Sequence, residues 1–311
     1  MNMPAITWTH GMPCLGPAVT SLGVFDGVHL GHQTLLHDAI KAARGSGVAS
    51  AIVTFDRDPD QVVTPEAAAP QLLTLSEKLA VLASLGPDLV LVVPFDDELA
   101  ALSPEAFVDE VLVPALDPVA VHVGYDFRFG HKASGDVATL QQLGDTHGFE
   151  VVPHELVLAE DEPVTSSRIR RTVAAGDVAA AARLLGRLHR IGGRVVAGRG
   201  AGAALGVPTA NIEPAAFTAV PGDGVYAGFA ATASGIWPAA ISVGVAPTFA
   251  DAHDLVEAHL IGFQGDLYGA EMSIEFLARL REQRVFDSEE ALAAQMRADV
   301  AQVAEITGVT P

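Results

Sequence analysis

The spacing of apolar residues changes once along the chain, near Gly186, and this change limits the folds that the sequence can adopt. Before Gly186, short β-branched runs alternate with longer stretches of helical periodicity, which is typical of α/β proteins. Short connections between these stretches predict a parallel, doubly wound sheet that binds ligands beyond the carboxyl ends of its strands. The predicted strands are residues 18–24, 51–55, 89–93, 119–123 and 149–152, and the predicted helices are residues 31–44, 76–85, 104–112 and 135–147.

After Gly186, short strand-like runs are separated by Gly/Pro turns, which predicts a small antiparallel β-barrel. A terminal helix is expected to begin near Asp287 and Ser288, since these are good N-cap types and an apolar face follows. At about 150 residues per domain, the 311 residues suggest two domains, 1–186 and 187–311. The strands expected in the second half are residues 194–197, 225–230, 239–243, 257–261 and 272–276.

The overall charge disfavours a protein that coats nucleic acid. The chain has 18 Lys+Arg against 38 Asp+Glu, a net charge of −20, which repels DNA, RNA and anionic membranes. Residues 224–250 carry no charge over more than the ~20 residues of a spanning helix. Glycines and prolines interrupt them, so we predict strands there and no membrane association.

Features of the N-terminus and the single cysteine favour a cytoplasmic protein. Cys14 cannot form a disulfide within the chain, and no secretory signal is visible, since the N-terminus lacks a basic region and the first Lys or Arg is Lys41. The sequence leaves the oligomeric state open.

Basic residues gather in one segment despite the acidic average. Between residues 168 and 199, eight arginines meet only one acid, Asp177, so the segment carries a charge of +7. A solvated helix face explains several of these arginines, but such a strip also suits small, highly charged nucleotides. The eight are Arg168, Arg170, Arg171, Arg183, Arg187, Arg190, Arg194 and Arg199.

A motif for phosphate binding stands where the first predicted strand gives way to the first helix. The segment G-V-F-D-G-V-H-L-G-H at residues 23–32 places His29 and His32 on either side of Gly31. Backbone N–H groups at a helix N-terminus attract anions, the glycine admits a phosphate, and two imidazoles can clamp a triphosphate. A tight turn with surface histidines is the alternative, but the order of strand, turn and helix favours nucleotide binding. The turn adds Gly23, Phe25 and Asp26 as candidate binding residues.

This segment resembles the nucleotidylyltransferase motif of the bacterial bifunctional riboflavin kinase/FAD synthetase (FMN adenylyltransferase) family. Three longer segments resemble further motifs of that family: G-Y-D-F-R-F-G at 124–130, T-S-S-R-I-R at 165–170 and L-G-V-P-T-A-N at 205–211. Shorter matches follow at 224–228, 242–244, 247–249, 256–259, 266–269, 280–281 and 286–288. The resemblance therefore covers nearly the whole chain, with the motifs in the family's order.

The resemblance implies a Rossmann-like nucleotidylyltransferase domain followed by a riboflavin kinase barrel. The kinase would convert riboflavin and ATP to FMN and ADP, and the first domain would convert FMN and ATP to FAD and pyrophosphate. Mg²⁺ would assist both steps, with the flavins and ATP as substrates. In adenylyl transfer, His29, His32 and Arg170 would stabilise charge on the α-phosphate and the departing pyrophosphate, without a protein nucleophile.

The kinase residues are assigned by the same resemblance. Glu257 would be the base that takes the proton of the ribityl hydroxyl, and Thr209 and Asn211 would bind the ATP-bound Mg²⁺, for which their oxygens are suitable ligands. Arg199 is the expected phosphate contact in the glycine-rich stretch. We assign His259, which can share a strand face with Glu257, no catalytic role.

Three further residues of the first domain are candidates for nucleotide binding. Asp126 can accept hydrogen bonds from a base or ribose, or it is simply a turn residue between the core residues Phe127 and Phe129. Ser166 and Ser167 can cap the helix that carries Arg170.

The sequence departs from the family pattern at five positions. Asp58 stands where histidine is expected, and a carboxylate ~4 Å from a phosphate costs up to ~4 kcal/mol at an effective dielectric of about 20, which Arg57 would offset. The other departures are Ala203, Ala204, Ala246 and Gly262. They leave open an enzyme with one impaired activity, or a non-catalytic flavin- or nucleotide-binding protein. Another kind of nucleotidylyltransferase would leave the second half unexplained.

Overall fold

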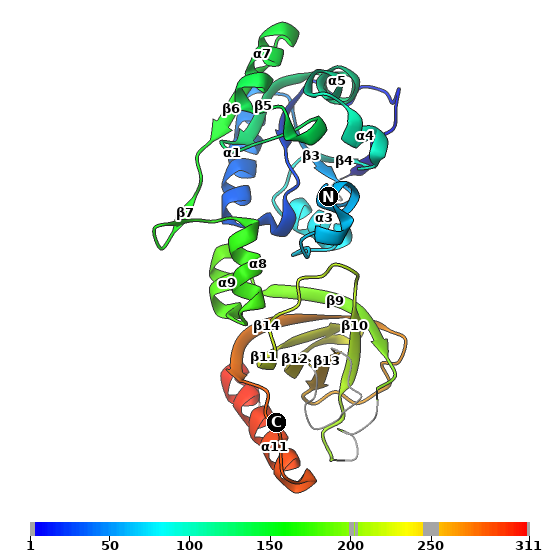
Figure 1. Cartoon of the computed structure of the whole chain (residues 1–311), viewed down its shortest axis with the longest axis vertical. Coiled ribbons are helices and arrows are strands. Elements are labelled where there is room, and N and C mark those ends of the chain that lie inside the picture. Colours follow the sequence, from blue (N-terminus) through cyan, green and yellow to red (C-terminus); the bar gives the residue numbers. More distant parts are fainter. Residues whose placement is uncertain (1–3, 199–201, 203–204, 245–254, 310–311) are drawn as a thin grey trace. The chain divides into compact units, whose positions relative to one another are not determined.

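The computed structural model describes residues 4–198, 202, 205–244 and 255–309, which form two compact units (Figure 1). The first, here called the sheet unit, comprises the residues up to Gln71 together with Leu75–Ser166. The second, the barrel unit, comprises Leu72–Thr74 and the residues from Ser167 onward. The domain boundary that we expect after Gly186 stays a prediction.

The sheet unit contains a six-stranded parallel sheet with the strand order β1-β4-β3-β2-β5-β6. The chain adds β3 and β4 on one side of β2 and then adds β5 and β6 on the other. The order therefore reverses between β2 and β5, and their carboxyl ends flank the crevice where such sheets bind ligands. The strands are β1 (Ala5–Thr7), β2 (Ala18–Leu22), β3 (Ala49–Phe55), β4 (Leu89–Val93), β5 (Pro118–Gly124) and β6 (Glu150–His154).

Helices cover both faces of this sheet. Helix α1 buries Ala39 and Ala43 against Val19 and Ala120, while Leu22 and other apolar residues face the main core on the opposite side. The helices are α1 (Leu30–Ser46), α2 (Asp60–Val63), α3 (Leu75–Ser84), α4 (Asp97–Ala101), α5 (Pro104–Phe107), α6 (Val113–Leu116) and α7 (Val137–His147). The 3₁₀ turns are η1 (Asp26–Val28), η2 (Pro65–Ala67) and η4 (His131–Ala133), and a short hairpin joins β7 (Leu158–Ala159) to β8 (Glu162–Pro163).

One predicted helix differs in detail from the observed one. The helix expected over 104–112 is α5, followed by a π turn, η3 (Val108–Leu112), and α6. Pro114 stands at the start of α6. Since proline has no N–H to donate to the preceding turn, regular α-helical bonding is interrupted here.

The barrel unit is a closed six-stranded antiparallel barrel with the order β10-β13-β12-β11-β14-β9. Its interior is filled by apolar side chains, among them Tyr226, Ile241, Ile274 and Phe276, all fully buried. The strands are β9 (His189–Val196), β10 (Ala210–Pro214), β11 (Gly224–Thr232), β12 (Gly235–Gly244), β13 (Leu255–Leu260) and β14 (Glu271–Arg281). The predicted fold class, an α/β unit followed by an antiparallel barrel, is confirmed.

Within the described ranges the barrel unit also contains α8 (Ser166–Ala174, apart from its first residue), α9 (Val178–Leu185) and α11 (Glu289–Thr307). Helix α9 packs on β9 and β14, and α11 packs on β11 and β12. The predicted cap of the last helix is confirmed, since the Ser288 hydroxyl accepts the Ala291 N–H at 3.2 Å. The uncharged run from residue 224 forms strands β11 and β12 as far as Gly244. None of the helices in the described ranges has the length and apolar character to cross a membrane.

Candidate active sites

The turn between β2 and α1 is held in an unusual backbone conformation. Phe25 and Val28 have φ angles of 53° and 39°, and Gly27 between them has φ 77°. For non-glycine residues the left-handed region costs on the order of 1–3 kcal/mol each, and such residues cluster at functional sites. The Phe25 ring lies edge-on to His32 with the ring centres 5.3 Å apart, so it forms a wall behind this imidazole.

The two histidines of the motif are brought together. His29 is the N-cap of α1, and its Nδ1 accepts the His32 backbone N–H at 3.3 Å. The two rings stack with centroids 3.6 Å apart. A Cβ on Gly31 would lie 3.2 Å from the His29 ring, so glycine suits the close approach of ring and backbone. When the His29 ring is neutral, the acceptor role of its Nδ1 leaves the proton on Nε2.

His32 is kept neutral. Its pKa is held well below the ordinary value, first by burial and then by the charges of His29 and Lys78. Its Nδ1 is buried, and among the described residues it has no hydrogen-bond partner. A neutral imidazole with an unused ring nitrogen can bind a ligand by donating or accepting one hydrogen bond.

The two serines open the helix that carries Arg170, as the sequence indicates. Helix α8 begins at Ser166, so Ser166 and Ser167 are its first two residues, and their part in nucleotide binding stays a prediction. The Ser166 hydroxyl donates to the carbonyl of Asp26 at 2.9 Å and so fixes the turn before the histidine motif. Ser167 is exposed, and Arg170 follows on the same helix.

Asp126 lies at the carboxyl end of β5, the strand next to β2. The turn that presents Asp126 is fixed by two backbone bonds: the Tyr125 N–H donates to His154, and the Phe127 N–H donates to Gly124. Asp126 itself is exposed. Phe129 is buried and Phe127 packs against the core, as we expect from the sequence. The histidine turn and Asp126 thus follow the neighbouring strands β2 and β5 at the carboxyl edge of the sheet.

The departure at Asp58 is not balanced by Arg57. The Arg57 guanidinium pairs with Asp56 at 2.8 Å, and the other oxygen of Asp56 accepts the Phe95 N–H. Asp58 is buried, with 8% of its surface exposed. The Asp58 carboxylate instead interacts electrostatically with Lys78, a buried lysine of α3 that no sequence motif indicates.

In the barrel unit, strand register assembles a row of polar side chains. Asn211 on β10 pairs with Glu257 on β13, and Glu257 pairs with Ser242 on β12. The neighbours of Glu257 point into the core, so this row lies on the outer face of the barrel. The Thr209 hydroxyl donates to Oε2 of Glu257 at 3.4 Å, while Gln283 donates to the Ser242 hydroxyl at 2.8 Å.

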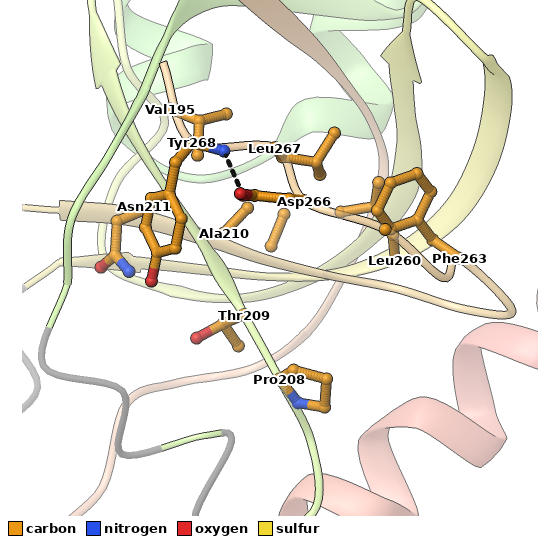
Figure 2. A pocket seen from close by; sticks show the side chains of 12 residues that line it. Val195, Pro208, Thr209, Ala210, Asn211, Leu260, Phe263, Asp266, Leu267 and Tyr268 are labelled. Carbon is orange, nitrogen blue, oxygen red and sulfur yellow. Dashed lines mark hydrogen bonds between the residues drawn. The ribbon is translucent and has the colours of Figure 1, made fainter. Parts of the chain in front are cut away.

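A pocket of about 200 Å³ opens beside this row, and Figure 2 shows the Thr209 hydroxyl and the Asn211 amide on the same side of the strand. The Tyr268 N–H donates to Oδ1 of Asp266 at 2.9 Å, within the lining of the pocket. His259, on the Glu257 face, donates from Nδ1 to the Pro208 carbonyl at 2.7 Å. The lining residues are Val195, Pro208, Thr209, Ala210, Asn211, Ala258, Leu260, Phe263, Gly265, Asp266, Leu267 and Tyr268.

The Asn211 amide is packed closely by glycine backbone. A Cβ on Gly198 would lie 1.9 Å from Nδ2 of Asn211, and one on Gly202 would lie 3.1 Å from the Thr209 hydroxyl. Oδ1 of Asn211 is buried without a hydrogen-bond partner within the described part of the chain. An amide oxygen that is buried and unused marks a place for a ligand.

Several predicted positions lie elsewhere. Arg199, Ala203, Ala204 and Ala246 are outside the described residues, as is the motif segment 247–249. Gly262 has φ 81°, a left-handed conformation that glycine adopts freely. The other arginines of the basic segment lie on α8, α9, β9 and the loop before β9.

Comparison with known proteins agrees with this arrangement. The FAD synthetase family model matches residues 12–168, and the riboflavin kinase family model matches residues 185–307. A bifunctional riboflavin kinase/FMN adenylyltransferase of Pseudomonas fluorescens is 40% identical over 284 residues, 91% of each chain. The protein of that name from Escherichia coli K12 is 33% identical over 94% of this chain and 93% of its own. The chain belongs to this bifunctional family.

Membership of this bifunctional family confirms the resemblance that the sequence motifs indicate, and both enzymatic domains are present in one chain. The fold also agrees with a crystal structure described as a macrolide-efflux protein from Streptococcus pneumoniae. The TM-score is 0.85 at 28% identity, over 96% of this chain and 97% of the other. Efflux is said of that protein alone, whereas the two family models account for both halves of this chain.

Proposed function

We propose that the barrel unit phosphorylates riboflavin to FMN and that the sheet unit adenylylates FMN to FAD. The observation that carries the proposal is the row of polar side chains on the barrel. Glu257 on β13 pairs directly with Asn211 on the neighbouring strand β10 and accepts a hydrogen bond from Thr209. Such a row offers a carboxylate base next to two oxygen groups that suit a phosphate-bound cation.

In the kinase step, Glu257 accepts the proton of the ribityl 5′-hydroxyl while that oxygen attacks the γ-phosphorus of ATP. The bond from the γ-phosphorus to the oxygen that bridges it to the β-phosphate breaks, and ADP leaves. The Thr209 hydroxyl, which donates to Oε2 at 3.4 Å, orients the carboxylate.

The donor set next to Glu257 fits Mg²⁺. Within the described ranges no three His, Cys, Asp or Glu side chains gather to hold a metal, so a cation here would depend on neutral oxygens and on the phosphates of ATP. Oδ1 of Asn211 is buried and unpartnered among the described residues, and the Thr209 hydroxyl lies on the same face. Asn211 and Thr209 would hold the ion, which neutralises phosphate charge when it is bound.

In the adenylyl step, a phosphate oxygen of FMN attacks the α-phosphorus of ATP, and pyrophosphate leaves. His29 and His32, stacked at the N-terminus of α1, donate hydrogen bonds to the phosphates. Asp126, at the end of β5, holds the base or ribose. The part of Arg170 rests on its place in the motif.

We also propose that the enzyme works in the cytoplasm, with riboflavin, FMN and ATP as its small-molecule partners. The basis is the absence of internal disulfides with a single cysteine, Cys14, and the use of ATP as a substrate in both steps.

The division between the units is tested with two matched variants. Glu257→Gln keeps the shape of the side chain but cannot take a proton, so we expect FMN formation to fall by about 10²-fold to 10⁴-fold. Conversion of supplied FMN to FAD should be unchanged. His32→Ala should show the reverse pattern. Equal loss of both activities in either variant would refute the division, and tight flavin binding without turnover in the wild type would indicate a binding protein.

A further inference from the structure

Lys78 is a buried cation that joins two segments of the sheet unit. Its side chain comes from α3, and only 4% of the residue is exposed. Nζ donates to the carbonyl of Val24 at 3.1 Å and to that of Phe55 at 2.8 Å. These carbonyls lie at the carboxyl ends of β2 and β3. Lys78 therefore connects the turn before the histidine motif to the segment that contains Asp58.

Three carboxylates interact electrostatically with this ammonium. Burial lowers the pKa of Lys78, and the carboxylates of Asp58, Asp26 and Asp56 oppose this, with Asp58 the strongest. Asp56 already pairs with Arg57. Asp58 and Asp26 are 8% and 4% exposed, so the ammonium and these two carboxylates are buried in one part of the unit. A buried charge is tolerated when opposite charge compensates it.

The position of Asp58 makes this compensation matter for catalysis. Asp58 follows β3, the neighbour of β2, at the edge of the sheet where the nucleotide binds. A carboxylate there repels the phosphates of ATP unless a cation balances it. The charge of Lys78 also reaches the histidine motif, since it contributes to the lowered pKa of His32.

We propose that Lys78 is a positioning residue for adenylyl transfer. Its ammonium balances the Asp58 carboxylate, which stands where we expect a histidine, and its two hydrogen bonds hold the segments after β2 and β3 together. The proposal rests on the proposed function of the sheet unit.

The test is a cycle of four proteins: the wild type, Lys78→Met, Asp58→Asn and the double variant. The conversion of FMN to FAD gives kcat and the KM for ATP, while riboflavin phosphorylation is the control. Lys78→Met is expected to raise the KM for ATP about tenfold or more, because Asp58 loses its counter-charge. In the double variant the KM should return to within about threefold of that of Asp58→Asn, whereas any loss of kcat that comes from the two missing hydrogen bonds should remain. Lys78→Arg should retain most of the activity.

Equal effects of Lys78→Met in the wild-type protein and in the Asp58→Asn variant would overturn the proposal. A purely structural lysine would lower kcat and stability in both backgrounds without this coupling. The urea midpoints of the four proteins test the same coupling without an activity assay. Adding Asp58→Asn to Lys78→Met should restore stability that Lys78→Met loses. A wild-type protein that forms no FAD from FMN would refute the proposed function. The urea midpoints would still show whether Lys78 compensates the charge of Asp58. If Lys78→Met does not fold, the double variant must fold, or the proposal fails.

Discussion

Gly198→Ala tests the geometry of the kinase site by adding one methyl group. The new Cβ would lie 1.9 Å from Nδ2 of Asn211, whereas ordinary contact begins at 3.4 Å. The Asn211 amide must therefore move by about 1.5 Å, the difference of the two distances. A misplacement of about 1 Å can cost 10²-fold in rate, so kcat/KM for FMN formation should fall by about 10²-fold, or about 2.7 kcal/mol of transition-state stabilisation.

The assay follows the two steps separately with purified protein. Riboflavin with ATP and Mg²⁺ gives the kinase rate, and supplied FMN gives the adenylylation rate, which should not change in Gly198→Ala. Gly45→Ala is the matched control, because a Cβ at Gly45 meets no atom within 4 Å. A folded Gly198→Ala protein with kinase kcat/KM within about threefold of the wild type would refute the placement of Asn211 in the site.

Three further predictions concern the barrel unit. His189 is fully buried and donates to a backbone carbonyl, and burial lowers its pKa to about 4. In the unfolded chain this histidine takes up a proton below pH ~6.5, so the free energy of unfolding should fall by up to about 3 kcal/mol between pH 6.5 and 4. The urea midpoint should fall over the same range, and it should depend less on pH in His189→Gln. Arg281 donates three hydrogen bonds of 2.8, 3.1 and 3.2 Å to the Asp299 carboxylate. Asp299→Asn should therefore destabilise the barrel by about 2–4 kcal/mol and lower the temperature at which kinase activity is lost, and an unchanged temperature would contradict this. His259→Ala removes the bond to the Pro208 carbonyl and should raise the KM for ATP several-fold with little change in kcat, and an unchanged KM would show that the bond does not position Thr209.

Much of the fold could be predicted because periodicity is a local property. The strand expected over 89–93 is β4, Leu89–Val93, and the last helix begins at its predicted cap. Four strands were missed, among them β7 and β8 of the short hairpin, which have two residues each. β1 has only three residues, and β10 contains Asn211 and ends in Pro214, types with low strand preference. β10 exists because β9 and β13 pair with it on both sides and close the barrel.

The site was predictable only where its geometry is local. The pairing of His29 with His32 follows from one cap at the start of one helix, which a motif can encode. Lys78 is held by the carbonyls of Phe55 and Val24, which lie 23 and 54 positions before it in the sequence. No local sequence pattern therefore reveals that this lysine is buried. The alignment of Glu257 with Ser242 depends on strand register, which the sequence motifs do not contain.

The most direct test of the central claim is a time course of the purified chain with riboflavin, ATP and Mg²⁺, with the flavins separated at each point. We expect FMN to appear first, with ADP, and FAD to follow with pyrophosphate. A folded, Mg²⁺-supplied sample that forms neither FMN nor FAD would contradict it.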